Sequence, residues 1–555
     1  MVSRIPPKDY PLVIKFGGGL HTRASEPDID PAEASDGKNF YLDLENKELR
    51  PRKPFDLIGT VPNASEIRGG ASLLKSDGTV STIFQAGTKV YSWDGTTNFT
   101  PVGTVDGTAK LRGHWRSHNW VLGDKVLITD LSLVETVKEW NGTTFSSTSF
   151  VKSDATSFGN FYAKYCSVSN ERAVFGNVKD GSSTSPHLIV GSAGSVYNEI
   201  SVTARPASSL STDDAFYIPM PDLKPINGMV EAFGVSVFST EKGRLFNLTG
   251  TTAKDYAITE FFPGSAASGA ESLAYIGTDI IYGRQGRIES VRDSQSFGNA
   301  ESDDLSVAIA DVVSSYTGWS TVFNSRTNLV YMFPTLQSEV WVFNNATRLV
   351  RVLSANDVNQ FVQQEQAQAR TGKLSPWMRY TTNHTLAFQP TFVMSMLDPA
   401  DGLEYVFMGD SAGNIYRMEG TGTSGDGATS AIQTRWESKV FSAPLDAEVY
   451  DVEGYVKYKK NLAATVTLTF LCSGKAAFDS AVSVSLPAIS GANYFGGSNY
   501  FGGSIYFGVP FSNRIIRQPF KPPGQMSDFQ VRVDVESNND FAISEIGLRF
   551  KAASQ

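Results

Sequence analysis

A short phrase recurs seven times along this chain: a glycine turn followed by an apolar strand that carries an aromatic or aliphatic anchor. The anchors lie 42 to 75 residues apart, at Tyr91, Trp140, Tyr197, Phe246, Ile288, Trp341 and Tyr416. A period near 40–50 residues is typical of β-propellers, in which each repeat forms one four-stranded blade. One twisted blade cannot bury both of its faces, so blades must stack around an axis. The sequence therefore predicts an all-β fold built on a divergent β-propeller of about seven blades.

The composition supports a strand-rich fold. Of the 555 residues, 41% are hydrophobic and 12% are aromatic, which is enough for a large core, and 49 are glycine. No stretch approaches 18 apolar residues, so we expect no membrane-spanning helix. The first residues lack the apolar segment of a signal peptide. Two cysteines, Cys166 and Cys472, are too few for a disulfide framework, and we expect both to be free thiols.

The chain divides into three regions that differ in composition and sequence pattern. Residues 1–54 are rich in proline, glycine and acids, which predicts an extended N-terminal arm with one short strand near 40–44. Such an arm buries too little apolar surface to fold alone, so we expect it to dock on the C-terminal domain or on another subunit. Residues 55–428 hold the repeats and end in a glycine-rich linker over 420–427. Residues 429–555 contain alternating strands and predict a β-sandwich or jelly roll that serves as a platform domain.

Two segments interrupt the repeats. Residues 302–316 place apolar side chains at helical spacing after a Ser/Asp cap, which predicts a short helix. Residues 359–370 are rich in glutamine and predict either a polar helix or a loop.

An aromatic insert lies within the predicted sandwich. The phrase Asn-Tyr-Phe-Gly-Gly-Ser occurs twice in succession and is followed by a third Tyr-Phe pair, so that the six rings belong to Tyr494, Phe495, Tyr500, Phe501, Tyr506 and Phe507. One interpretation is a long hairpin whose rings pack on the sandwich. The other is a contact patch for a neighbouring subunit, or a gate. Six exposed rings would promote aggregation, so we expect them to be covered in the assembled state.

Few residues carry the patterns of catalysis or metal binding. His114 and His118 have the spacing of two metal ligands on one helical face, but a turn and a strand would separate them by ~13 Å. The aspartates of residues 398–414 lack the spacing of an EF-hand and suit turns between strands. No Walker loop, nucleophile elbow or Cys-x-x-Cys motif is present. We therefore expect no catalytic, cofactor or metal site, and no enzymatic activity.

The charge of the chain argues against tight binding of nucleic acid. The formal net charge is −9, and adhesion to DNA needs basic surface that releases phosphate counterions. Two short basic clusters, residues 49–54 and 455–460, either contact phosphate or an acidic partner or are ordinary solvated faces.

Two stretches carry a resemblance to a known family. Residues 17–52 contain Gly-Gly-Leu, then Asp-Pro-Ala-Glu-Ala-Ser-Asp-Gly-Lys-Asn-Phe, then Leu-Arg-Pro-Arg, and residues 324–348 contain Asn-Ser-Arg-Thr-Asn-Leu-Val-Tyr and Glu-Val-Trp-Val-Phe-Asn. Together with the order of arm, propeller and sandwich, these stretches resemble the tail nozzle proteins of short-tailed bacteriophages, also called tail tubular protein B. They are similar as well to the packaged-DNA stabilisation proteins of related phages.

The resemblance implies a structural virion protein of the viral tail, assembled in the host cytoplasm. It implies a homohexameric tube below the portal and adaptor ring, with fibres or spikes at its upper rim and a closed gate below. DNA would pass through the lumen during ejection without specific binding, and an acidic lumen would repel its phosphates.

A carbohydrate-binding or glycan-degrading propeller is the alternative. Sugar sites of propellers lie at the central opening and need acids and arginines that converge there. Candidate residues on suitable strands and loops are Glu231, Glu241, Arg284, Arg287 and Arg292.

Overall fold

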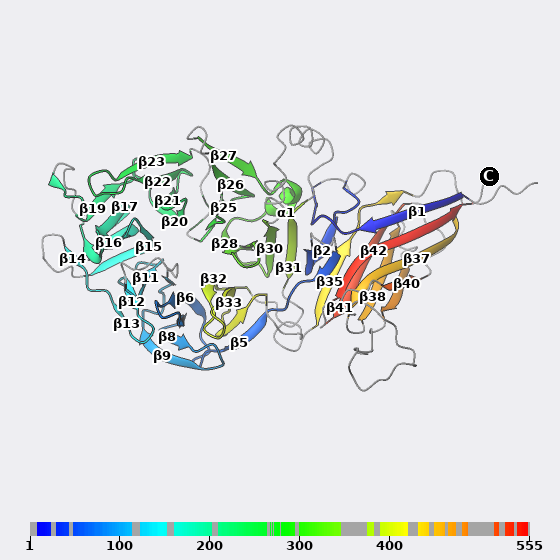
Figure 1. Ribbon diagram of the computed structural model, residues 1–555, viewed down its shortest axis with the longest axis horizontal. Coiled ribbons are helices and arrows are strands. Elements are labelled where there is room, and N and C mark those ends of the chain that lie inside the picture. The colour runs from blue at the N-terminus through cyan, green and yellow to red at the C-terminus, as the bar shows by residue number, and fades with distance from the viewer. Residues whose placement is uncertain are drawn as a thin grey trace, which may run out of the picture.

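The protein consists of a ring of β-sheets joined to a β-sandwich (Figure 1). The computed structural model describes residues 8–552 apart from 24–28, 44–47, 114–122, 153–159, 202–208, 263–266, 268, 270, 278, 295–298, 346–374, 382–388, 420–430, 443–448, 461–463, 473–479, 487–515, 521–527 and 538–540. Figure 1 shows the ring at one end of the molecule and the sandwich at the other, with the sixth blade between them.

The described residues form seven blades. The first blade contains β6 (Ile67–Leu74), β7 (Val80–Ala86), β8 (Lys89–Trp93) and β9 (Phe99–Thr104). The second contains β10 (Leu111–Gly113), β11 (Val126–Asp130), β12 (Lys138–Trp140) and β13 (Phe145–Ser147). The third contains β14 (Val151–Lys152), β15 (Phe161–Ser169), β16 (Arg172–Asp180), β17 (Ser183–Ala193), β18 (Val196–Ile200) and β19 (Phe216–Pro219). The fourth and fifth contain β20 (Ile226–Ala232), β21 (Val235–Thr240), β22 (Leu245–Thr249) and β23 (Ala257–Phe262); and β24 (Leu273–Tyr275), β25 (Asp279–Arg284), β26 (Arg287–Ser294) and β27 (Asn299–Asp304). The sixth contains β28 (Trp319–Asn324), β29 (Leu329–Pro334), β30 (Glu339–Asn344) and β31 (Trp377–Thr381), and the seventh contains β32 (Phe392–Leu397), β33 (Glu404–Gly409), β34 (Asn414–Arg417) and β5 (Asp56–Thr60).

The ring is closed by strands from both ends of the propeller sequence. Neighbouring blades contact one another in chain order near the axis, with β11 of the second blade against β15 of the third, and β32 of the last blade lies against β6 of the first. The outermost strand of the seventh blade is β5, which pairs with β34 from Asn414 opposite Thr60 to Arg417 opposite Asp56. Because the first and last propeller segments share one sheet, neither can leave without opening the ring.

The repeat anchors confirm the link between the sequence period and the blades. Six of the seven lie on the third strand from the axis and are buried, namely Tyr91, Trp140, Phe246, Ile288, Trp341 and Tyr416. The exception is Tyr197, which lies half-buried on β18 at the periphery of the third blade. The third strand packs between two neighbouring blades, so a large apolar side chain is needed there once in each blade.

The sandwich is built from both ends of the chain. One sheet contains β1 (Lys8–Lys15), β3 (Phe40–Asp43), β4 (Glu48–Pro51), β37 (Val449–Lys460), β40 (Ile516–Phe520) and β42 (Phe541–Ala552). The other contains β2 (Asp36–Lys38), β35 (Ile432–Glu437), β36 (Phe441–Ser442), β38 (Ala464–Cys472), β39 (Ser480–Leu486) and β41 (Asp528–Ser537). The arm thus supplies four strands. The expected strand near residue 40 is β3, whereas β1, β2 and β4 lack a strong pattern of their own and are held by pairing with the sandwich.

The helix expected over residues 302–316 is shorter than predicted. The structure has a 3-10 turn, η3 (Val307–Ile309), followed by one helical turn, α1 (Ala310–Val313). Residues 302–304 belong instead to β27, because they pair with β26 as the outer strand of the fifth blade. The glutamine-rich residues 359–370 lie outside the described residues.

Turns of the first two blades share one motif. The carboxylate or amide oxygen of the first residue of Asp-Gly-Thr or Asn-Gly-Thr accepts hydrogen bonds from the amide and the hydroxyl of the threonine two residues on. This arrangement occurs at Asp77, Asp94, Asp106 and Asn141. Gly95 follows with φ of 84°, a conformation that favours glycine. The motif satisfies the backbone at the turn and leaves the acidic residues at the surface.

We expect Trp341→Ala to lower the free energy of unfolding by about 3–5 kcal/mol, because Trp341 is fully buried in the sixth blade. Tyr197→Ala removes a half-buried ring at the periphery, so its cost should be nearer about 1 kcal/mol. Urea unfolding followed by circular dichroism measures both. Equal costs would contradict the different roles assigned to the two anchors.

Candidate functional site: the arm junction and the propeller channel

The arm passes the outer strand of the sixth blade at very short range. The Gly19 amide donates to the Ser375 carbonyl at 2.6 Å, and the Leu20 amide donates to the Trp377 carbonyl at 2.7 Å. A Cβ atom on Gly19 would lie 2.0 Å from the Trp377 carbonyl oxygen, which no real contact allows. Glycine is therefore required at this position by the approach of two backbones. This explains physically the Gly-Gly-Leu stretch of the arm.

Two other sequence stretches of the arm meet at a buried arginine. Arg52 is 1% exposed, and its Nε donates to Asn39 Oδ1 at 3.0 Å while Nη2 donates to the Thr381 carbonyl at 3.2 Å. The guanidinium lies 3.8 Å from the centroid of the Phe55 ring, a cation–π arrangement. Asn39 has a left-handed φ of 56°, and its amide donates to the Arg379 carbonyl at 2.8 Å. The Asp-Gly-Lys-Asn and Leu-Arg-Pro-Arg stretches therefore form one contact with the sixth blade.

A histidine and a buried glutamate lie beside Gly19. His21 Nδ1 is 2.8 Å from Glu33 Oε2, and the other carboxylate oxygen of Glu33 accepts a hydrogen bond from the Ser375 amide. The hydrogen bond to Glu33 raises the pKa of His21 more than burial lowers it. Arg23 and Asp311 also act on His21, in opposite directions. The ion pair thus ties the arm to itself and, through Glu33, to the blade.

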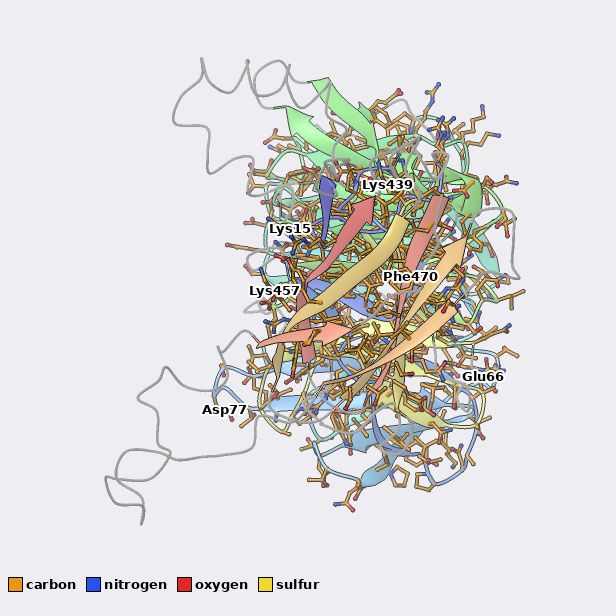
Figure 2. All side chains as sticks on the ribbon, turned by 90° about the vertical axis from the view of Figure 1, so that its right-hand side faces the viewer. Lys15, Glu66, Asp77, Lys439, Lys457 and Phe470 are labelled. Carbon is orange, nitrogen blue, oxygen red and sulfur yellow. The ribbon has the colours of Figure 1, made fainter. Side chains whose placement is uncertain are left out.

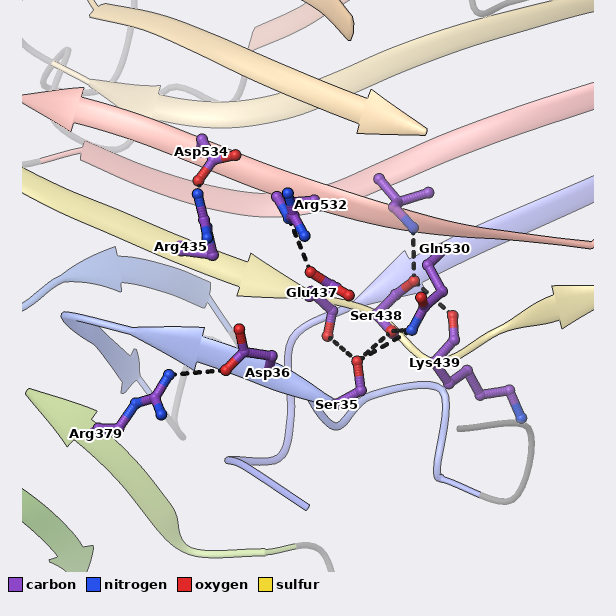
Figure 3. A network of polar contacts seen from close by, with 11 residues as sticks. Ser35, Asp36, Arg379, Arg435, Glu437, Ser438, Lys439, Gln530, Arg532 and Asp534 are labelled. Carbon is purple, nitrogen blue, oxygen red and sulfur yellow. Dashed lines mark hydrogen bonds and ion pairs between the residues drawn. The ribbon is translucent and has the colours of Figure 1, made fainter. Parts of the chain in front are cut away.

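The next arm residues bridge the propeller and the sandwich (Figure 3). Asp36 Oδ1 is 2.8 Å from Arg379 Nη2 on the sixth blade. The Ser35 hydroxyl donates to the Ser438 carbonyl in the sandwich at 2.8 Å, and Gln530 Nε2 donates to the same carbonyl at 3.1 Å. Two consecutive arm residues therefore bind two different domains, and the arm fills the junction between them.

The central channel of the propeller is crossed by an ion pair. Arg112, on the inner strand of the second blade, approaches Glu271 at the start of the fifth, with Nε 2.5 Å from Oε1. Arg112 Nη1 also donates to the Arg68 carbonyl of the first blade at 2.7 Å, and its guanidinium lies 5.0 Å from the Phe392 ring of the seventh. The Glu271 carbonyl accepts from the Thr321 amide of the sixth blade at 2.7 Å. Residues of five blades thus meet around this one pair.

The charged residues considered for a sugar site lie at both ends of their hairpins and not all at one end. Arg284 faces Arg287 across the turn of the β25–β26 hairpin, and Arg292 faces Asp279 at the other end, ~17 Å along the strand. Glu231 lies on β20 of the fourth blade, and Glu241 follows β21. Arg284 is paired with Glu289 at 3.0 Å.

Several other sequence predictions can now be placed. Cys166 is a buried free thiol, as expected, and burial raises its pKa. The turn role expected for the aspartates of residues 398–414 is confirmed: Asp398 accepts from the Ala400 amide and Asp410 from the Asn414 amide, each at 2.8 Å. His114, His118 and the six rings of the aromatic insert, Tyr494, Phe495, Tyr500, Phe501, Tyr506 and Phe507, lie outside the described residues.

Two features are absent from the described part of the chain. It contains no group of three or more His, Cys, Asp or Glu side chains placed to hold a metal ion. Nor does any helix there have the length and apolar character needed to cross a bilayer.

The seven blades place this chain among the β-propeller proteins. No protein-family model matches the sequence, and no curated protein sequence is detectably similar to it. Among solved structures, virginiamycin B lyase from Staphylococcus aureus is similar at 8% identity and a TM-score of 0.40, covering 65% of this chain and 98% of that one. The structure of YCF48 bound to D1 peptide is similar at 10% identity and a TM-score of 0.38, and the match covers 66% of this chain and 95% of that one. The WD40 domain of Toxoplasma gondii coronin is similar at 9% identity and a TM-score of 0.35, and the match covers 69% of this chain and 86% of that one. These likenesses concern the fold alone.

We expect Gly19→Ala to detach the arm from the sixth blade, because the new Cβ cannot coexist with the Trp377 carbonyl. The overlap should cost about 1–3 kcal/mol or more. Limited proteolysis should then cut within residues 8–40 while the propeller stays intact. Gly269→Ala is the control, since a Cβ there meets no atom within 4 Å. Equal protease resistance of both variants would refute the close approach.

The His21–Glu33 pair predicts a pH dependence of arm docking. Because the pKa of His21 is raised on folding, the added stability is complete below about pH 6.5 and is lost as the pH rises through the folded pKa. His21 is partly exposed, so the effect should not exceed about 1 kcal/mol. Hydrogen exchange of residues 8–23, corrected for intrinsic rates, should show weaker protection at pH 8.5 than at pH 6. In His21→Gln this difference should vanish, and an unchanged difference would contradict the assignment.

Proposed function

We propose that this chain is a structural virion protein, the tail nozzle subunit of a short-tailed phage. Six copies form a tube that retains DNA and then conducts it, and that docks the adaptor ring and the tail fibres. The observation that carries the proposal is the arm junction, because the same arm stretches that carry the resemblance are the ones that join propeller and sandwich into one core.

A tube wall needs subunits whose domains keep a constant angle. One hydrophobic cluster runs from the sandwich through the arm into the sixth blade. Within it, Phe16 of the arm packs edge-on against Trp436 of the sandwich, with ring centroids 4.9 Å apart. Trp377 of the blade is also fully buried there. Close packing of this kind resists bending, because interiors have few voids and low compressibility.

The path of DNA follows from the channel and from the charge. Since Arg112 and Glu271 meet across the propeller channel, DNA would pass through a lumen formed between subunits and not through the propeller itself. Residues 55–428 carry 27 Lys and Arg against 37 Asp and Glu, a net charge of −10. Propellers lining a lumen would repel phosphates and let DNA slide. The proposal assigns no catalytic role to the chain.

The purified protein, alone or with the adaptor ring, should form particles of six times 60.2 kDa by mass photometry. Negative-stain images of these particles should show a six-fold ring. Fluorescence anisotropy should detect no affinity for duplex DNA at physiological salt, because the acidic surface offers no counterion release. A chain that stays monomeric with the adaptor present would overturn the proposal, as would glycan hydrolysis or tight, salt-dependent DNA binding.

A further inference from the structure

One turn of the second blade differs by a single amide group from three other turns of the same motif. Asp77, Asp94 and Asp106 are each followed by Gly-Thr, whereas the turn between β12 and β13 begins with Asn141 and continues with the same Gly-Thr. Figure 2 shows Asp77 at the outer margin of the molecule, where its side chain is exposed. The four turns therefore allow a carboxylate and an amide to be compared in one local structure.

The donors of this motif bind a carboxylate more closely than they bind the amide. The threonine hydroxyl lies 2.6–2.7 Å from the carboxylate in the three aspartate turns, but 3.0 Å from Oδ1 of Asn141. Hydrogen bonds to an ionised acceptor are shorter and stronger than those to a neutral one. The same hydroxyls lower the pKa of Asp77, Asp94 and Asp106, and that of Asp94 falls to about 2. An aspartate at position 141 would therefore be held in its ionised form.

The donors around Asn141 act on the atom that carries charge when its amide is hydrolysed. Oδ1 accepts from the amide and the hydroxyl of Thr143, each at 3.0 Å, and from the Thr144 amide at 2.8 Å. When a nucleophile adds to Cγ, this oxygen becomes an oxyanion, which fixed donors stabilise. No described residue accepts a hydrogen bond from Nδ2, the leaving nitrogen. Thr143 and Thr144 are exposed, so water reaches the turn.

The backbone nitrogen of Gly142 is placed to be the nucleophile. Gly142 has a φ of 92° and no side chain to shield its amide, and none of the described residues accepts a hydrogen bond from that amide. Lys75, in the turn between β6 and β7, lies over this glycine, where a Cβ would be 2.6 Å from Nζ. A positive charge beside the amide stabilises the negative charge that develops when the amide loses its proton.

We propose that Asn141 is a self-deamidation site, at which the chain converts the side-chain amide to a carboxylate with water as the only co-reactant. The Gly142 nitrogen loses its proton to water and bonds to Cγ of Asn141. The Cγ–Nδ2 bond breaks, ammonia leaves, and a cyclic succinimide remains. Water then adds to Cγ, the new N–Cγ bond breaks, and the Gly142 nitrogen regains a proton. The net reaction consumes one water and releases one ammonium ion, and nothing is oxidised or reduced.

The turn also selects the product. Water can open the succinimide at Cγ, which gives aspartate, or at the backbone carbonyl, which gives isoaspartate with an extra main-chain carbon. The donors to Oδ1 favour attack at Cγ. An extra main-chain atom would also disturb the pairing of Trp140 with Phe145 that frames the turn. Aspartate is then the stable end point, because closure back to the succinimide needs the protonated acid.

A second Asn-Gly pair of the chain has the opposite environment. Asn227 and Gly228 lie on β20, where Gly228 is paired with Ser239. Oδ1 of Asn227 is buried with no donor among the described residues, and Nδ2 donates to the Ala267 carbonyl at 3.0 Å. The oxygen that would become charged is thus unsupported, and the leaving nitrogen is held. We expect the same dipeptide to remain intact at this position.

The conversion changes the contact between two blades. It adds one negative charge to the turn of the second blade, beside Lys75 of the first. The inference rests on this turn alone and not on the proposed nozzle function. A chain that forms no tube would still deamidate, and a tube whose subunits keep the amide would overturn only the inference.

The test is peptide mapping by mass spectrometry of the purified full chain during incubation at pH 8.5. The peptide that contains Asn141 should show the mass change of amide to acid at least about tenfold faster than the peptide that contains Asn227, since one oxyanion donor is worth about 10²–10³ in an enzyme site. Electron-transfer fragmentation should identify aspartate, not isoaspartate, as the main product. The converted protein should coelute on ion exchange with the Asn141→Asp variant.

Two neighbouring threonines provide a matched pair of variants. Thr143→Val removes the hydroxyl donor and keeps the backbone donors, so conversion at Asn141 should slow several-fold. Thr144→Val is the control, because Thr144 donates through its backbone amide and should allow the wild-type rate. Thermal unfolding followed by circular dichroism should be the same for both, since both side chains are exposed. The proposal is overturned by conversion no faster at Asn141 than at Asn227, by isoaspartate as the main product, or by equal rates in the two threonine variants.

Discussion

The close passage of the arm between the sixth blade and the sandwich is the contact on which the rest of the molecule depends. Gly19 allows two backbones to hydrogen bond at a distance that any side chain would prevent, and Phe16 and Leu20 on either side of the glycine run are buried in the same core. Arg52 and Asn39 then bind the blade edge a second time, further along the arm. Without these contacts the sandwich would lose four strands, and the outer strand of the sixth blade would lose its cover.

The propeller depends in turn on where the arm ends. The chain leaves the sandwich through Arg52 and enters β5, which completes the seventh blade by pairing with β34. The N-terminal segment therefore closes both domains, first the sandwich and then the ring. A single segment that serves two cores couples their stabilities, because loosening the arm removes strands from one domain and strains the closing strand of the other. The Arg112–Glu271 pair adds a contact across the axis that no single blade could make.

Charge is distributed unevenly over the domains of this chain. The propeller carries most of the negative charge, in turns where threonine and backbone donors stabilise the carboxylates. The rest of the chain is nearly neutral, with 21 Lys and Arg against 20 Asp and Glu. Surface charges add little to stability one at a time, but a net charge concentrated in one domain creates a field around it. Such a field suits the lumen proposed above, which would repel DNA.

By itself the sequence determined the class of fold, a blade count of about seven and most strands of the sandwich. These features follow from local periodicity: one large buried anchor in each blade, such as Trp140 or Trp341, and strict alternation in strands such as β38 and β41. Only the tertiary structure decided the strands of the arm and the ion pair across the channel. Arg112 and Glu271 are 159 residues apart, and Gly19 meets Trp377 from the far end of the chain. No local pattern records such a partner, because the contact exists only after the blades have closed and the arm has docked.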